Sequence, residues 1–176
     1  MKESVEVNDC DNKGSRKELA VSLFKEGYNC SQSVFATYAD LYGIDRELAL
    51  RLSASFGGGI GRMREVCGTA SGMFMIAGLE TGCVVGRDQA GKSANYAVVQ
   101  HLAEEFKKRS GGSIICRELL GLDKKVSAFT DEEKKTAATP KASERTEQYY
   151  KKRPCIQLIQ DACEIIESEL VKDKLG

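Results

Sequence analysis

Cysteine is the residue type in this chain that most plainly offers chemistry. The 176 residues include seven cysteines, one histidine and no tryptophan. A secreted disulfide framework uses cysteines in pairs, and seven cannot all be paired within one chain. A chain of this length also buries enough surface to fold without cross-links. Because the first residues lack a basic start followed by an apolar run, we expect a cytoplasmic protein. Its cysteines would then serve as thiols, metal ligands or redox centres.

Four of the cysteines fall at the expected starts of helices or just after a glycine-rich turn: Cys30, Cys67, Cys116 and Cys155. The first turn of a helix presents unpaired N–H groups and the positive end of the helix dipole. This environment lowers the pKa of a thiol by up to about 1.5 units and so favours the nucleophilic thiolate. The four cysteines are therefore the candidate catalytic residues.

The same four cysteines form a candidate metal site in an alternative interpretation. Four thiolates repel one another, so holding them together requires a cation, and zinc or an iron–sulfur cluster accepts four cysteine ligands. No C-x-x-C pair is present, so only the fold could assemble such a site. Spacing alone favours a third interpretation, in which each cysteine is a small buried apolar residue.

The elements that must position these cysteines are helices. Apolar residues recur every three or four positions, which predicts an all-α fold: a single-domain helical bundle of about six to eight helices. We expect residues 1–14 to be a disordered tail that contains Cys10, and residues 15–172 to form the one domain. Capping residues predict helices over 15–27, 29–43 and 45–56, the last with Leu48, Leu52 and Phe56 facing the core.

In the second half of the chain, glycines, charged residues and prolines mark where helices are expected to start and end. We expect a central, buried helix over about 66–79, a long helix from Asp88 to Ser110 and a short helix over 114–120. Further helices are expected to start at Thr130, at Thr139 and at Pro154.

A run of glycines precedes Cys67, in the segment GGGIGRMR. Exposed amides and an arginine there could bind an anionic cofactor, so the candidate cofactor-binding residues are Gly58, Gly59, Gly61, Arg62 and Gly68. The segment lacks the GxxxxGK[ST] pattern and a preceding strand. A tight turn that brings Cys67 inward is the favoured interpretation.

The order of these motifs resembles that of a known family. The segments in question are GYNCSQSV, FGGGIGRMREVCGTASGMFMIAGLETG, CRELLG and RPCIQLIQDA. Together, over about residues 16–170, they are similar to the redox-active family named for its C_GCAxxG_C_C signature. The resemblance implies that Cys30, Cys67, Cys116 and Cys155 are the signature cysteines. Thr69 stands where the family usually has alanine.

Charge and hydropathy limit the classes of partner. The 26 basic and 26 acidic residues cancel, so no net field attracts nucleic acid or an anionic membrane. The longest apolar stretch, 73–79, is far shorter than the ~20 residues of a membrane-spanning helix. We expect an unidentified redox partner, and self-association into a homo-oligomer is compatible with the sequence.

Three functions follow from these alternatives. The leading hypothesis is a thiol-based redox or electron-transfer protein, an oxidoreductase or electron carrier, in which Cys30 or Cys67 is the nucleophile and the resolving cysteine is left open. The second is a zinc or iron–sulfur protein, and the third is a helical interaction module with structural cysteines. We expect Cys163 to be a core residue and His101 to have a surface or packing role. For Cys83 a structural or incidental role is favoured over that of an accessory thiol.

Overall fold

Regular structure in the computed structural model is entirely helical within the described residues, 15–175. It comprises nine α-helices: α1 (Arg16–Lys25), α2 (Cys30–Tyr38), α3 (Arg46–Ser53), α4 (Gly68–Thr81), α5 (Gln89–Arg109), α6 (Cys116–Leu119), α7 (Asp131–Thr136), α8 (Glu147–Lys151) and α9 (Cys155–Glu169). Three short 3-10 helices, Ala39–Tyr42, Ala54–Phe56 and Lys172–Lys174, complete the set. The all-α prediction is confirmed, and the nine helices exceed the expected six to eight by one. The predicted tail and Cys10 lie outside the described residues.

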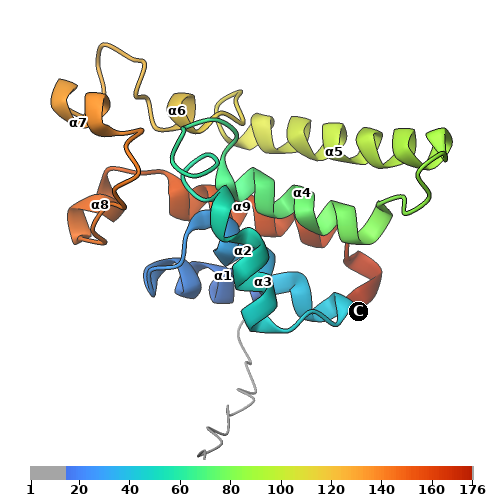
Figure 1. Cartoon of the computed structure of the whole chain (residues 1–176). Coiled ribbons are helices and arrows are strands. Elements are labelled where there is room, and N and C mark those ends of the chain that lie inside the picture. Colours follow the sequence, from blue (N-terminus) through green and yellow to red (C-terminus); the bar gives the residue numbers. More distant parts are fainter. Residues whose placement is uncertain (1–14, 176) are drawn as a thin grey trace, which may run out of the picture.

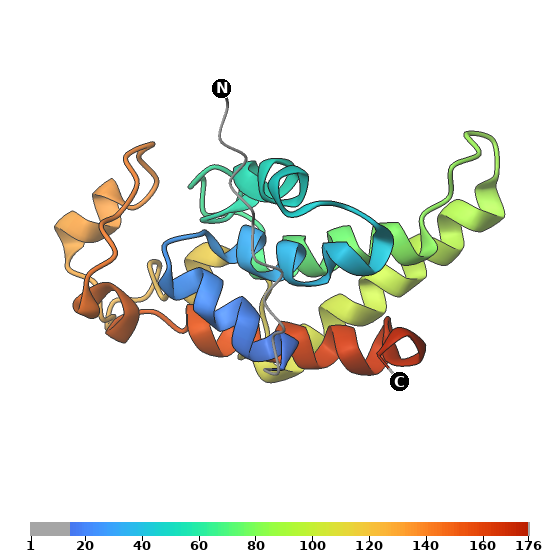
Figure 2. The same cartoon turned by 90° about the horizontal axis from the view of Figure 1, so that it is seen from below.

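The core is built around α4, as the sequence predicts for a central, buried helix. Helix α4 packs between α2 and α5, and α9 contacts α1, α2, α4 and α5 (Figure 1). The close approach of α2 to α4 depends on Gly72, because a Cβ there would lie 3.0 Å from the carbonyl oxygen of Ser31. Seen from below, α7 and α8 lie at one end of the molecule and the α4–α5 turn at the other (Figure 2).

Side-chain caps fix the start of α2, the helix that begins with Cys30. Asn29 Oδ1 accepts a hydrogen bond from the Gln32 amide, and Gln32 Oε1 accepts one from the Asn29 amide, both 3.0 Å long. The side-chain amides of the two residues then donate to Ala54 O and Leu50 O. The capping box therefore also ties the start of α2 to α3 and the turn after it.

Three local predictions are wrong. In α3 the side chains expected to face the core are largely outside it, with Leu48 46% and Leu52 48% exposed, because the helix packs through the small residues Ala49 and Ser53. Phe56 lies beyond α3 in a 3-10 turn and is only half-buried. No helix starts at Thr139, since that segment runs irregularly to the cap of α8.

Two helices start two residues later than the sequence predicts, for one shared reason. Val66 and Ile115 pair in an isolated antiparallel bridge, which keeps both segments extended before α4 and α6 begin. None of the helices in the described part of the chain is both long enough and apolar enough to cross a membrane.

Two glycines of α4 offer a matched test of the packing. Gly72→Ala forces a methyl group against α2, whereas Gly78→Ala adds one where nothing lies within 4 Å. Because both gain the same helix propensity, we expect Gly72→Ala to have the lower free energy of unfolding by about 1–3 kcal/mol. Urea denaturation of the two variants measures this difference. Equal midpoints would show that α2 and α4 are not in tight contact at this position.

Candidate functional site

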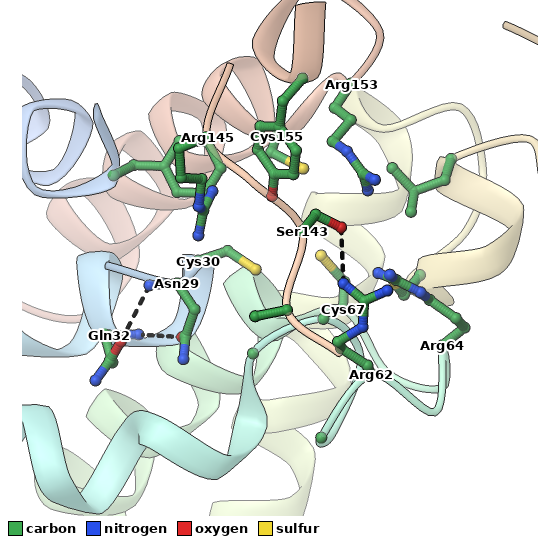
Figure 3. A pocket seen from close by; sticks show the side chains of 18 of the residues that line it. Asn29, Cys30, Gln32, Arg62, Arg64, Cys67, Ser143, Arg145, Arg153 and Cys155 are labelled. Atoms are coloured by element: carbon green, nitrogen blue, oxygen red, sulfur yellow. Dashed lines mark hydrogen bonds between the residues drawn. The ribbon is translucent and has the colours of Figure 1, made fainter. Parts of the chain in front are cut away.

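The four signature cysteines line one cavity. Cys30, Cys116 and Cys155 are the first residues of α2, α6 and α9, and Cys67 is the residue before α4. All four contribute to the wall of a cavity of about 440 Å³. Figure 3 shows the sulfur atoms of Cys30, Cys67 and Cys155 turned toward this space. The structure thus brings together residues that are more than 120 positions apart in the sequence.

Backbone pairing places Cys67 beside Cys116. The Cys67 amide donates to Ile114 O and the Cys116 amide donates to Glu65 O, each over 2.7 Å. These are the two hydrogen bonds of the bridge between Val66 and Ile115. The start of α4 and the start of α6 are therefore fixed to each other through the very residues that carry the thiols.

The glycine-rich segment is the tight turn that the sequence favours. Five consecutive residues, 58–62, have left-handed backbone conformation, with φ between 55° and 73°, and Arg64 follows with φ of 64°. Two glycines make contacts that no Cβ would allow. A Cβ on Gly59 would lie 2.6 Å from Cys116 Cβ, and one on Gly68 would lie 2.8 Å from Cys30 Sγ.

The candidate cofactor-binding residues fall into two groups. Gly58, Gly61 and Arg62 line the cavity, whereas Gly59 and Gly68 stand outside its lining and press against the cysteines. Their roles in binding a cofactor stay a prediction. The departure at Thr69 leaves the contact between Gly68 and Cys30 in place, and the threonine side chain is fully buried.

Arg62 and Arg64 hold a segment of chain across the cavity. Arg62 donates to Thr139 O, to Ser143 Oγ and to Ala137 O over 2.8, 2.7 and 3.1 Å. Arg64 also donates to Ala137 O, and its Nη1 lies 3.7 Å from Cys116 Sγ. Pro140, Ala142 and Ser143 of this segment contribute to the cavity wall.

Two further arginines complete the wall, and sequence analysis missed both. The guanidinium of Arg145 lies 4.7 Å from the ring centre of Phe24 and 4.6 Å from that of Tyr149. Arg153 lies 4.4 Å from the Tyr149 ring on another side. Arg153 ends the basic run 151–153, a pattern that is typical of a solvated helix face or a terminal cap. The only sequence signal for a place in the site is that Arg153 lies two residues before Cys155.

The expectation that the helix starts activate all four thiols is wrong. Burial raises the pKa of Cys67, Cys116 and Cys155, and negative charge on Cys30 raises each of them further. At Cys116 the nearby Arg64 guanidinium opposes the rise in pKa, and at Cys67 hydrogen bonds from the amides of Thr69 and Ala70 do so. Loss of hydration outweighs the helix dipole because these three thiols are withdrawn from water.

The remaining candidates lie elsewhere. Cys163 is fully buried in α9, as predicted, and Cys83 lies in the turn between α4 and α5 near Asp88. His101 faces Glu169 on the surface, with Nε2 and Oε2 3.1 Å apart, and it is not part of the cavity. Over residues 15–175, no three cysteine, histidine, aspartate or glutamate side chains are arranged to hold a metal ion. The thiols as they stand therefore do not fit a zinc or iron–sulfur site.

Comparison with known proteins gives the same family as the order of the cysteine motifs. Residues 28–169 match the model of the family described as "Putative redox-active protein (C_GCAxxG_C_C)". The chain belongs to this family. The match includes the four cysteines of the cavity and the left-handed turn before Cys67. No curated protein and no solved structure matches this C_GCAxxG_C_C protein.

We expect the buried thiol of Cys163 to make stability depend on pH. Burial raises its pKa to about 12, whereas a thiol in an unfolded chain has a pKa of ~8.5. The neutral thiol thus stabilises the fold fully below pH ~8.5, and this contribution is lost as the pH rises toward the folded pKa. Above pH ~8.5 the free energy of unfolding should fall more steeply in the wild type than in Cys163→Ala, by about 1.4 kcal/mol per pH unit. Urea denaturation across this range measures both slopes, and parallel slopes would contradict the assignment.

Arg62 offers a test of how the segment over the cavity is held. Arg62→Ala removes three hydrogen bonds to residues 137–143, whereas Ser143→Ala removes only one of them. We expect limited proteolysis to cut this segment at least about tenfold faster in Arg62→Ala, because opening it no longer breaks those bonds. Ser143→Ala should be affected much less. Equal cleavage of Arg62→Ala and the wild type would show that the segment is held by other contacts.

Proposed function

We propose that this protein is a thiol–disulfide redox protein in which Cys30 attacks a substrate disulfide and Cys67 resolves the product. The observation that carries the proposal is the convergence of four free cysteines on one cavity. A scattered set of buried, inert cysteines would have no reason to share a cavity wall. The family description is of the same redox class.

Cys30 has the position expected of the nucleophile. It is only partly buried, whereas Cys67 and Cys116 are 5% and 7% exposed. It begins α2, and its sulfur lies against Gly68, the first residue of α4. The Cys30 sulfur therefore lies where the starts of α2 and α4 meet, at the wall of the cavity.

Cys67 has the position expected of the resolving thiol. It directly precedes Gly68, the residue against which the Cys30 sulfur lies. Burial contributes most to the raised pKa of Cys67, and negative charge on Cys30 raises it further. Once Cys30 becomes part of a mixed disulfide, that charge is gone and the pKa of Cys67 falls. The resolving thiolate, which the Thr69 and Ala70 amides stabilise, would then form more readily after the first step than before it.

The proposed reaction balances as two successive exchanges. The Cys30 thiolate attacks one sulfur of a substrate disulfide, forms a mixed disulfide and expels the other half as a thiolate that takes up a proton. The Cys67 thiolate then attacks Cys30 Sγ and releases the second half in the same way. Two protein thiols are oxidised to one disulfide and the substrate is reduced to two thiols. An external dithiol would reduce the protein again.

Three measurements test this proposal on the intact chain. Protein purified without oxygen is assayed for iron, zinc, sulfide and visible absorption, and then for oxidation by bis(2-hydroxyethyl) disulfide, an uncharged reagent. We expect Cys30→Ser to slow the loss of free thiols at least about 100-fold, because the attacking thiolate is absent. Cys163→Ser, a cysteine outside the cavity, is the matched control. Cys67→Ser should accumulate the mixed disulfide on Cys30, visible by mass spectrometry.

Other results would replace the proposal with one of the alternatives. Bound iron with sulfide and broad visible absorption would indicate a cluster, and stoichiometric zinc would indicate a structural metal site. Metal-free protein whose four cavity thiols do not react would leave an interaction module with structural cysteines. If Cys30→Ser reacts as fast as the wild type, Cys30 is not the nucleophile and the proposal is wrong.

A further inference from the structure

The cavity wall carries an excess of positive charge. Four arginines line it, Arg62, Arg64, Arg145 and Arg153, and no aspartate or glutamate does. Their guanidinium groups approach the space from several sides (Figure 3). Burial lowers the pKa of Arg62, and the like charges of Arg64 and Arg153 lower it further. Gathering cations in a partly desolvated space is unfavourable unless anions occupy it.

Arg145 and Arg153 have guanidinium N–H groups without a hydrogen-bond acceptor among the described residues. The guanidinium of Arg62 is occupied by residues 137–143. Arg145 donates from Nη2 to Tyr28 O, but its Nη1 is buried without a hydrogen-bond partner among the described residues. Arg153 stacks on Tyr149 and Phe129 and has no side-chain hydrogen bond within residues 15–175. Unsatisfied guanidinium donors of this kind bind carboxylate or phosphate oxygens.

Tyr149 connects these arginines to the thiols. Its pKa is raised by burial first and then by Cys155, with a smaller contribution from Cys30, while Arg145 and Arg153 oppose the rise. The ring therefore lies among both sets of groups. A ligand that contacts Arg145 and Arg153 would reach the reactive sulfur of Cys30 within the same cavity.

The size and lining of the cavity indicate the kind of anion. The cavity volume of about 440 Å³ is in the range of sites that bind small organic molecules. A single inorganic oxyanion would fill little of this space and would contact few of the lining residues. Apolar side chains share the wall with the arginines: Phe24, Leu119, Leu120 and Leu158. An organic molecule with separated negative groups would satisfy both parts of the lining.

We propose that the cavity binds a low-molecular-weight disulfide that carries carboxylate groups. One half of the molecule lies in the cavity with its carboxylates on Arg145 and Arg153, and its sulfur faces Cys30. This inference rests on the proposed function, since the bound disulfide is the oxidant that Cys30 reduces. The half outside the cavity leaves as a thiol after the first exchange, and the half inside leaves after the second.

Binding is tested separately from reaction. S-methylglutathione, an unreactive thioether of an anionic tripeptide thiol, is titrated into Cys30→Ser protein by calorimetry. We expect Arg153→Gln in this background to weaken binding about 10-fold to 100-fold, because a charge-assisted hydrogen bond is lost. Arg153→Lys, which keeps the charge, should lose less. Arg109→Gln removes an equal charge at the end of α5, where Arg109 pairs with Glu164, and should bind like the parent.

Reaction with disulfides of different charge completes the test in protein that retains Cys30. Oxidised glutathione is anionic, bis(2-hydroxyethyl) disulfide is neutral and cystamine is cationic. The wild type should prefer the anionic reagent, and Arg153→Gln should reduce that preference about tenfold or more.

Failure of the two proposals can be told apart. If S-methylglutathione does not bind, or binds equally to Arg153→Gln, while the neutral disulfide still oxidises Cys30, this inference is wrong and the proposed function stands. If binding depends on Arg153 but no disulfide reacts, the anion site stands. The disulfide assignment and the proposed function are then both overturned.

Discussion

The close approach of two glycines to two cysteines is the constraint on which the site depends. Gly59 touches Cys116 and Gly68 touches the sulfur of Cys30, at separations that leave no space for a side chain. The chain reaches this position only through a left-handed turn that includes three residues other than glycine, Ile60, Arg62 and Arg64. Each costs ~1–2 kcal/mol, so the turn persists because the bridge and the arginine contacts fix its ends.

This packing sets the electrostatics of the cavity. Thiols withdrawn from water are weaker acids, and burial raises the pKa of Cys67, Cys116 and Cys155. The arginines supply the opposite charge, and Arg64 lies directly against the Cys116 sulfur. A site of this kind holds few thiolates at one time. A second thiol would instead ionise more readily once the first thiolate has lost its charge by forming a disulfide. This order suits stepwise disulfide exchange.

The capped helix starts, the central position of α4 and the all-α class could be predicted because local signals determine them. Caps such as Asn29 and Asp88, and the small residues of α4, act within a few residues of their own positions. Sequence could not show that burial outweighs the helix dipole, since that depends on packing between distant segments. It also missed Arg145 and Arg153, because an arginine in a charged run looks the same whether it faces water or a cavity. The exposure of Leu48 and Leu52 was mispredicted because α3 packs by its small residues.

Disulfide mapping after limited oxidation tests the central claim most directly. Reduced protein is exposed to one equivalent of a small disulfide, quenched with acid and digested, and the peptides are identified by mass spectrometry. The account predicts a single new bond within the cavity, between Cys30 and Cys67, that a dithiol reverses. Oxidation confined to Cys83, or protein whose cavity cysteines all remain free thiols, would contradict it.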